Sequence, residues 1–175
     1  MIQERQNVAA GVESRVIQPG EGYRLALAGG IYTIKATGRD TGGAYALMEM
    51  LVPPQGGPPP HRHSREVESF YILEGSLSVW LGNRKLTGVA GSLIIAPPGL
   101  THAFKNEGET AARALMMITP AGLEDFFEEV GSPLKQGAAA PDEITPEDLD
   151  RIAATAARYG IEIKLPETEA HPKSK

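Results

Sequence analysis

The chain has 175 residues, 22 acidic and 17 basic side chains, a net charge of −5 and no cysteine. This length suits one domain with a helical appendage. The acidic balance argues against nucleic-acid and anionic-membrane partners, which require a basic surface, and the lack of cysteine excludes disulfides and thiolate metal sites. No apolar run reaches the ~18 residues of a membrane span, and residues 1–11 lack the apolar segment of a signal peptide, so we expect a cytoplasmic protein.

Short apolar runs separated by glycine and proline, which number 20 and 14, fill the first two thirds of the chain. This pattern is typical of an all-β sandwich or barrel. Residues 1–13 have little periodicity, and we interpret them as an N-terminal arm. The run 44–52 is apolar almost throughout, so periodicity does not separate helix from buried strand, but the neighbouring strands and the prolines that follow favour a strand. The predicted strands are residues 14–18, 23–27, 31–36, 44–52, 67–73, 77–81, 84–87, 92–96, 101–106 and 112–119.

Two turn signals predict hairpins. Glu74-Gly75-Ser76 lies between the strands at 67–73 and 77–81, and Gly82-Asn83 lies between 77–81 and 84–87. Both contain glycine, which tight connections between paired strands favour. We therefore expect each pair of strands to lie side by side in one sheet.

After Pro120 the pattern changes from strand to helix. Apolar residues at i, i+3, i+4 and i+7 predict an amphipathic helix; these residues are Leu123, Phe126, Phe127 and Val130. Thr145 followed by Pro146 marks the start of a second helix, and Gly160 ends it. We interpret residues 132–143 as a flexible linker and residues 166–175 as a tail. The predicted organisation is a β-barrel with its arm over residues 1–120 and a helical extension with the tail over residues 121–175.

Three of the four histidines fall in two stretches of the barrel region. His61 and His63 are two positions apart, so on a strand both side chains project to one face, ~6.6 Å apart. Two such imidazoles can bind one ion. His102 lies in the second stretch. A carboxylate from the next strand would complete a set of three histidines and one glutamate, and both Glu66 and Glu68 are candidates.

Nitrogen and oxygen ligands of this kind accept iron, manganese, nickel, copper, cobalt or zinc, so the sequence predicts one divalent transition metal ion but not its identity. Such a set leaves one or two positions open, as metal-assisted catalysis requires. A single H-x-H is more often a surface or core feature. The presence of a second histidine stretch favours the metal site, whereas His171 lies in the tail and is assigned no role.

The two stretches resemble the paired signature of the cupin family. The first cupin motif is G-x5-H-x-H-x3,4-E-x6-G; Gln55 stands at its leading glycine, and the other fixed positions are matched by His61, His63, Glu68 and Gly75. The second motif is G-x5-P-x-G-x2-H-x3-N, and its fixed positions are matched by Gly91, Pro97, Gly99, His102 and Asn106. The resemblance covers residues 14–120.

This resemblance implies an all-β fold, a double-stranded β-helix or jelly-roll barrel, followed here by C-terminal α-helices. It implies an ion inside the barrel, bound by His61, His63, Glu68 and His102. Only Glu68, and not Glu66, fits the spacing of the motif. The resemblance and the polar N-terminal arm together suggest a homodimer.

Strand alternation also predicts what surrounds the ion. If Glu68 points inward, Phe70 and Ile72 do so too, and Phe104 follows His102 on its strand. We take Phe70, Ile72 and Phe104 as candidate substrate-binding residues in a mainly apolar pocket, which suits an aromatic or aliphatic small molecule. The same side chains would serve equally well as barrel core.

The segment F-Y-I-L-E-G after Glu68, the single barrel and the C-terminal helices resemble the quercetin 2,3-dioxygenase-like branch of the cupins. That resemblance implies a dioxygenase whose flavonol-like or other small oxygenated aromatic substrate binds the ion, with Glu68 accepting the substrate's hydroxyl proton. The alternatives are a metal-dependent isomerase or lyase of a sugar or small acid, and a non-catalytic small-molecule-binding cupin. Fold alone does not choose among them.

Overall fold

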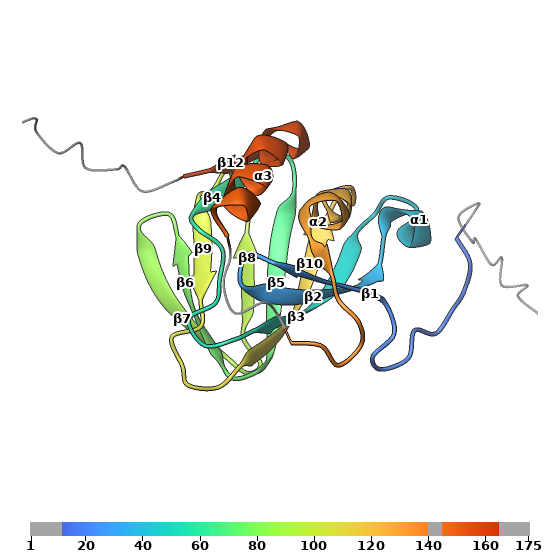
Figure 1. The fold of residues 1–175 in the computed structure, drawn as a ribbon, viewed down its shortest axis with the longest axis horizontal. Coiled ribbons are helices and arrows are strands. Elements are labelled where there is room, and N and C mark those ends of the chain that lie inside the picture. Colours follow the sequence, from blue (N-terminus) through green and yellow to red (C-terminus); the bar gives the residue numbers. More distant parts are fainter. Residues whose placement is uncertain (1–11, 140–144, 165–175) are drawn as a thin grey trace, which may run out of the picture.

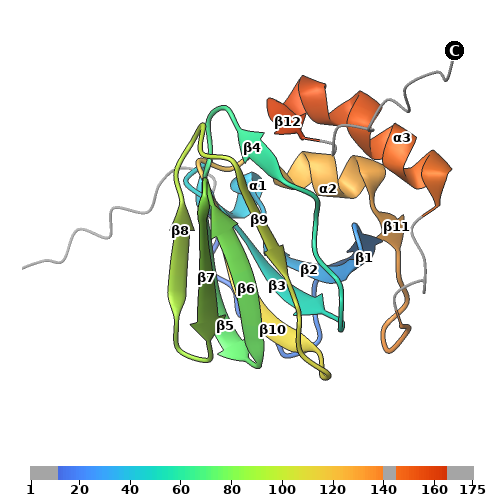
Figure 2. The same cartoon turned by 90° about the vertical axis from the view of Figure 1, so that its left-hand side faces the viewer.

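A computed structural model describes residues 12–139 and 145–164 of the chain. Two antiparallel sheets curve around a common core, and helices cover one end of the resulting jelly-roll barrel (Figures 1 and 2). The seven-stranded sheet has the order β11 (Ser132–Pro133), β1 (Tyr23–Leu27), β2 (Gly30–Ala36), β3 (Ala46–Val52), β10 (Ala112–Thr119), β5 (Val67–Glu74) and β8 (Leu93–Ala96). The five-stranded sheet has the order β12 (Ile161–Ile163), β4 (His61–His63), β9 (His102–Lys105), β6 (Ser76–Leu81) and β7 (Arg84–Val89).

The hydrophobic core lies between the two sheets, and many of its buried side chains come from β3, β10 and β5. Buried and less buried residues alternate strictly along β3, which confirms the strand predicted for the apolar run at 44–52. Met48 of β3 lies opposite Met116 of β10, which in turn lies opposite Phe70 of β5. All three side chains are buried. Alternation of this kind places one set of side chains in the core and leaves the other outside.

The prediction of a hairpin around Gly75 is wrong. β5 pairs with β10 and β8 in one sheet, whereas β6 pairs with β7 and β9 in the other. Gly75 is therefore the point where the chain crosses between sheets, with a φ of +74° that favours glycine. The second predicted hairpin is confirmed, because Leu81 of β6 lies opposite Arg84 of β7.

Residues 14–18, predicted as a strand, have no ladder partner in the described part of the chain. Most of this segment is exposed, including Val16, and only Ile17 is partly buried. One partly buried apolar residue offers too little contact to hold a strand against a sheet. Most of the predicted N-terminal arm and the predicted tail lie outside the described residues.

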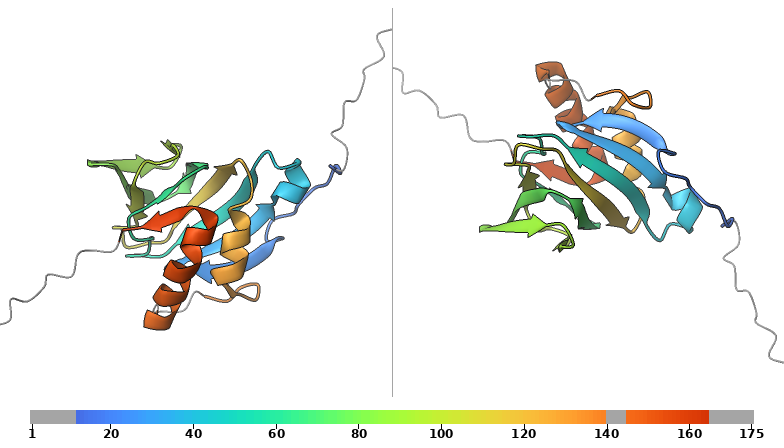
Figure 3. Two further views of the ribbon diagram at one scale, coloured as in Figure 1. Left: turned by 90° about the horizontal axis from the view of Figure 1, so that it is seen from above. Right: turned by 90° about the horizontal axis from the view of Figure 1, so that it is seen from below.

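The C-terminal part of the chain contains both predicted helices, α2 (Glu124–Val130) and α3 (Pro146–Ala156), which lie side by side against one end of the barrel (Figure 3). Thr145 caps α3, as its sequence predicts. This part also contributes strands, because β11 pairs with β1 and β12 pairs with β4. The segment read as a linker thus begins with a short strand. In the described residues no helix combines the length and apolarity that a bilayer crossing requires.

Candidate metal centre

Three strands bring four potential metal ligands together. His61 and His63 lie on β4, His102 opposite His61 on the neighbouring β9, and Glu68 near the start of β5 in the other sheet. One nitrogen or oxygen atom of each residue lies within 4.8 Å of the others. The two short motifs therefore meet across the barrel, and both are needed to form one site.

Hydrogen bonds to the main chain orient two of the imidazoles. His61 Nδ1 lies 2.9 Å from the carbonyl oxygen of Pro59, and His102 Nδ1 lies 3.0 Å from that of Leu100. A carbonyl oxygen only accepts, so each Nδ1 carries the proton. This tautomer leaves Nε2 of each ring as the metal-binding atom, a common arrangement for histidine ligands.

The contacts of His102 fit a bound cation. Its Nε2 lies 2.8 Å from Oε2 of Glu68, while its Nδ1 already donates to Leu100. Both contacts are satisfied together when the ring is doubly protonated and cationic, or when a metal ion takes the place of the Nε2 proton. Burial lowers the pKa of His102, but its hydrogen bond to Glu68 and the charge of that carboxylate raise the pKa above its ordinary value overall.

The surroundings of His63 are the observation that most directly favours a bound ion at this site. Both of its ring nitrogens are buried without a hydrogen-bond partner, and Nε2 lies 3.4 Å from Oε2 of Glu68. An unsatisfied buried polar group costs about 1–3 kcal/mol, which coordination of an ion would remove. Bonds of about 2.0–2.2 Å to one ion place ligand atoms at most roughly 4.4 Å apart, so small side-chain rotations suffice. Three imidazoles and a carboxylate suit a divalent transition metal.

The ionisation states also suit a metal. Burial lowers the pKa of His61 to about 4, so the ring is the neutral form that binds metals. Burial would raise the pKa of Glu68, but its contacts with His102 and His63 hold that pKa well below its ordinary range. Glu68 is therefore an ionised carboxylate at neutral pH.

Other motif residues shape the site without facing it. Gly99 adopts a φ of +78° and donates its N–H to the carbonyl oxygen of His63 at 2.7 Å. The Asn106 side chain is buried and donates to the carbonyl oxygens of Val52 and Thr110, both at 2.8 Å. These bonds fix the ends of the strands that carry the ligands.

The side chains beside the ligands are placed differently. Arg62 points out of the barrel to Glu162, which follows from its position between two inward histidines. Glu66 is buried and accepts from Arg65 Nε at 2.8 Å, and it lies outside the four-residue group. The structure thus brings Glu68, rather than Glu66, to the three histidines.

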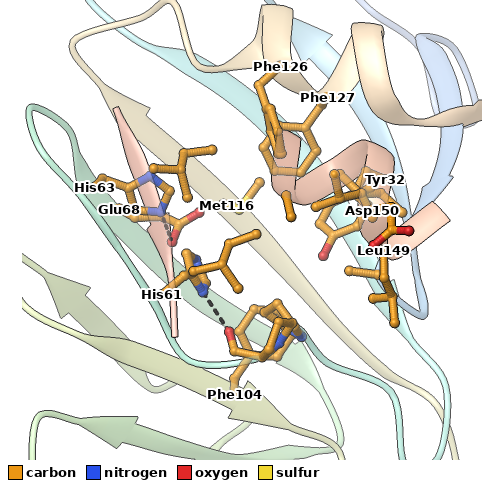
Figure 4. A pocket seen from close by; sticks show the side chains of 18 residues that line it. Tyr32, His61, His63, Glu68, Phe104, Met116, Phe126, Phe127, Leu149 and Asp150 are labelled. Atoms are coloured by element: carbon orange, nitrogen blue, oxygen red, sulfur yellow. Dashed lines mark hydrogen bonds and ion pairs between the residues drawn. The ribbon is translucent and has the colours of Figure 1, made fainter. Parts of the chain in front are cut away.

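A cavity of about 290 Å³ extends from the ligands to the C-terminal helices. Figure 4 shows His61, His63 and Glu68 on one side of it and Tyr32, Phe127 and the α3 residues Leu149 and Asp150 on the other. Its described wall is mostly apolar, and includes Leu27, Met116, Phe126, Ile152, Ile161 and Ile163.

The candidate substrate-binding residues are not equivalent. Phe104 lines the cavity, whereas Phe70 and Ile72 do not and lie in the core, 2% and 0% exposed. The Phe70 ring packs edge-on against Phe104, with ring centroids 5.4 Å apart. The structure therefore corrects the placement of Phe70 and Ile72: they support the wall rather than form it.

Much of the wall comes from residues that sequence reasoning did not assign to the site. Tyr32, Phe126, Phe127, Ile152 and Ile161 all line the cavity. The apolar stripe of α2 signalled a buried face, but nothing in the spacing indicated what that face would cover. β12 is too short to be recognised by periodicity.

Comparison with known proteins agrees with this architecture. Residues 48–118 match the family model described as a Cupin domain. Quercetin 2,3-dioxygenase of Bacillus subtilis is 24% identical over 151 residues, which make up 86% of this chain but only 44% of that protein. The structure of KdgF from Halomonas sp. has a TM-score of 0.57 and 18% identity, covering 65% of this chain and 99% of that one. A predicted oxalate decarboxylase from Thermotoga maritima has a TM-score of 0.56 and 22% identity, covering 61% and 99%.

Residues 48–118, which contain both motifs, match the Cupin domain model, and the described chain shares the fold of these solved structures. Its buried group of His61, His63, Glu68 and His102 fits the metal site of such a barrel. The chain spans less than half the length of the dioxygenase that it resembles.

Proposed function

We propose that the protein is a metal-dependent dioxygenase that acts on a flavonol-like or other small oxygenated aromatic substrate. The observation that carries the proposal is the position of a buried set of three histidines and one glutamate at the end of a mainly apolar cavity. The ligand set supplies a site for an ion with open positions. The cavity supplies a binding surface for an aromatic body.

The apolar wall favours this substrate class over a sugar. Away from the ligands, its polar side chains among the described residues are Tyr32 and Asp150, and the rest of the wall is aliphatic, aromatic or proline. A sugar would bury several hydroxyl groups in such a cavity without partners, each at a cost of about 1–3 kcal/mol. A flat aromatic molecule would instead lose apolar surface to the walls.

His61, His63, Glu68 and His102 would hold the ion, which would supply Lewis acidity toward oxygen atoms of the substrate. Glu68, held ionised beside His102 and His63, would accept a hydrogen bond and then the proton from a substrate hydroxyl. Phe104, Phe126 and Phe127 would pack against the substrate and exclude water. Both atoms of dioxygen would enter the product, so oxidation of the substrate balances the reduction of dioxygen without a further reductant.

The Bacillus subtilis relative supports the proposal, because its similarity extends over 86% of this chain rather than over the two motifs alone. Residues 145–164, which close the cavity, lie outside the 48–118 family match. The substrate is thus expected to depend on a part of the chain that the family match does not cover.

Oxygen consumption tests this function. Protein reconstituted separately with iron, manganese, nickel, copper, cobalt or zinc would be mixed with a panel of flavonols in a closed electrode cell. We expect uptake of one dioxygen per flavonol consumed with at least one redox-active metal, and loss of uptake in Glu68→Gln.

The matched control is Glu66→Gln, which alters a buried carboxylate outside the ligand group. It should retain oxygen uptake wherever it remains folded. Absence of uptake with every metal and flavonol would overturn the dioxygenase proposal. Isomerisation or cleavage of a sugar or small acid by the metal-loaded protein would then support the alternative reaction class.

A further inference from the structure

Tyr32 is a buried tyrosine on the side of the cavity away from the ligands. It lies on β2, is 4% exposed and forms part of the cavity wall. Figure 4 shows its side chain across the cavity from His63 and Glu68. Within the described residues, no hydrogen bond joins its hydroxyl to another group, although a buried tyrosine hydroxyl usually has a partner.

The ring of Tyr32 is held firmly in place. It packs edge-on against Phe127 of α2, with centroids 5.0 Å apart and an interplanar angle of 64°. Its hydroxyl end lies over Gly30, where an added Cβ would come within 3.3 Å of the hydroxyl oxygen. A polar group fixed in this way can recognise a ligand without losing further conformational freedom.

The hydroxyl is also in the protonation state of a donor. Burial, followed by the negative charge of Glu68, raises the pKa of Tyr32 above its ordinary value. The group therefore keeps its proton at neutral pH. It can donate to an oxygen or nitrogen of a ligand, or accept from a ligand hydroxyl.

We infer that Tyr32 is a specificity-determining residue whose hydroxyl binds a polar atom at the end of the substrate remote from the ion. The preferred substrate is then an elongated, mainly apolar molecule with an oxygen-bearing group at each end. One end binds at the ion and Glu68, the apolar body contacts the wall, and the other end reaches Tyr32. The inference rests on the proposed metal site and its cavity, but it does not require oxygen chemistry.

Binding of simple two-ended probes tests this role without turnover. The probes are the straight-chain alkanoates from hexanoate to decanoate and their ω-hydroxy derivatives. Their carboxylate can bind zinc, which has no redox chemistry, and a flexible chain series covers the span to Tyr32 without a prior distance. Dissociation constants would be measured by calorimetry on the zinc-loaded full chain, for the natural sequence and Tyr32→Phe.

We expect one chain length at which the ω-hydroxy acid binds the natural sequence at least as tightly as its parent. Tyr32→Phe should weaken that complex about five- to tenfold, since the ligand hydroxyl loses its partner. The parent alkanoate should change by less than about twofold, because phenylalanine preserves the wall. A purely structural role for Tyr32 would weaken both probes equally.

Asp150→Asn is the matched control, because Asp150 is the other polar side chain in this part of the wall and is exposed on α3. It should leave the ω-hydroxy preference intact. The inference is overturned if Tyr32→Phe leaves every ω-hydroxy acid unchanged, if Asp150→Asn removes the preference instead, or if the zinc protein binds none of the series. A protein that shows the Tyr32 effect but consumes no oxygen with flavonols keeps the two-ended site and loses only the proposed dioxygenase reaction.

Discussion

The ion-binding end of the cavity and its covered end are built in different ways. At the ion-binding end, four polar side chains come from two short stretches, and main-chain contacts such as those of Pro59 and Leu100 set the rings. At the covered end, aromatic and aliphatic side chains come from β1, β2, α2, α3 and β12, far apart in the sequence. One end depends on the positions of individual atoms, and the other depends on apolar volume.

This difference has a physical consequence. Coordination fails when one ligand atom moves or is lost, because bond lengths to an ion vary by only about 0.2 Å. Apolar contacts are not directional and tolerate exchange of similar volumes. The ligand group would therefore set the proposed chemistry, whereas substitutions at the covered end would alter the choice of the proposed substrate without altering the ligands.

His63→Ala is the sharpest way to break the ion-binding end, and it has the largest expected effect. Substitutions of residues that hydrogen-bond to metal ligands typically lower metal affinity by about 10–100-fold. Loss of one of the four ligands themselves should lower it further. The fold should persist, since the substitution also removes two buried nitrogens that lack partners. Chelator competition would measure the affinity, and circular dichroism the fold.

Arg62→Ala is the control for this change, because its side chain points outward from the same strand. It should bind metal as tightly as the natural sequence. Full metal occupancy in His63→Ala would contradict the assignment of His63 as a ligand.

The two ends also differ in how well the sequence predicts them. Strand alternation predicts that His61 and His63 share one face, but it leaves both Glu66 and Glu68 open. The spacing of the two cupin motifs selected Glu68 and added His102, and the structure brings these four residues together. Most strands of the barrel, and the helices α2 and α3, followed from periodicity and capping residues. β11 and β12 were not predicted, and the strand predicted at 14–18 has no ladder partner among the described residues. The crossover at Gly75 was not predicted either, since a glycine turn looks the same whether the chain returns to its own sheet or passes to the next.

The covered end was not predictable for the same reason. The sequence around Tyr32 is that of an ordinary strand, and only the tertiary structure, in which α2 packs beside Tyr32, shows that this residue lines the cavity. β12 has three residues and is a strand only because it pairs with β4. Such contacts join segments distant in sequence, and no local pattern encodes them.

Phe127→Ala would break the covered end alone. Phe127 is 7% exposed and packs against both Tyr32 and Phe126, so its truncation should lower the free energy of unfolding by about 3 kcal/mol. Metal affinity should stay within about twofold, since no ligand contacts depend on it. Urea unfolding and chelator competition would measure the two quantities.

Tyr71→Ala supplies the comparison for an aromatic residue outside the cavity, because Tyr71 is 45% exposed on the outer face of β5. This substitution should change the free energy of unfolding by no more than about 0.5–1 kcal/mol. A tenfold loss of metal affinity in Phe127→Ala would show that the two ends are coupled.

Gly160→Ala probes the junction between the two ends, where β12 of the cover pairs with the ligand strand β4. Gly160 has a φ of +69°, and an added Cβ would lie 2.2 Å from Ser64 Oγ. Its carbonyl oxygen accepts from the N–H of Ser64 at 2.9 Å, and Ile161 follows opposite His63. The substitution should therefore strain the turn and displace the Ser64 side chain, which loosens the pairing of β12 with β4. We expect it to lower the free energy of unfolding by about 2 kcal/mol and metal affinity by up to about tenfold.

Gly137→Ala separates backbone strain from displacement of the ligand strand. Gly137 has a φ of +79°, but nothing lies within 4 Å of its added Cβ, so only the backbone term of about 1 kcal/mol applies. Thermal unfolding and metal titration of both variants would distinguish the effects. Equal metal affinity in the two would mean that β4 holds its histidines without help from β12. A loss confined to Gly160→Ala would mean that the covered end, although it supplies no ligand, fixes the strand that carries two of them.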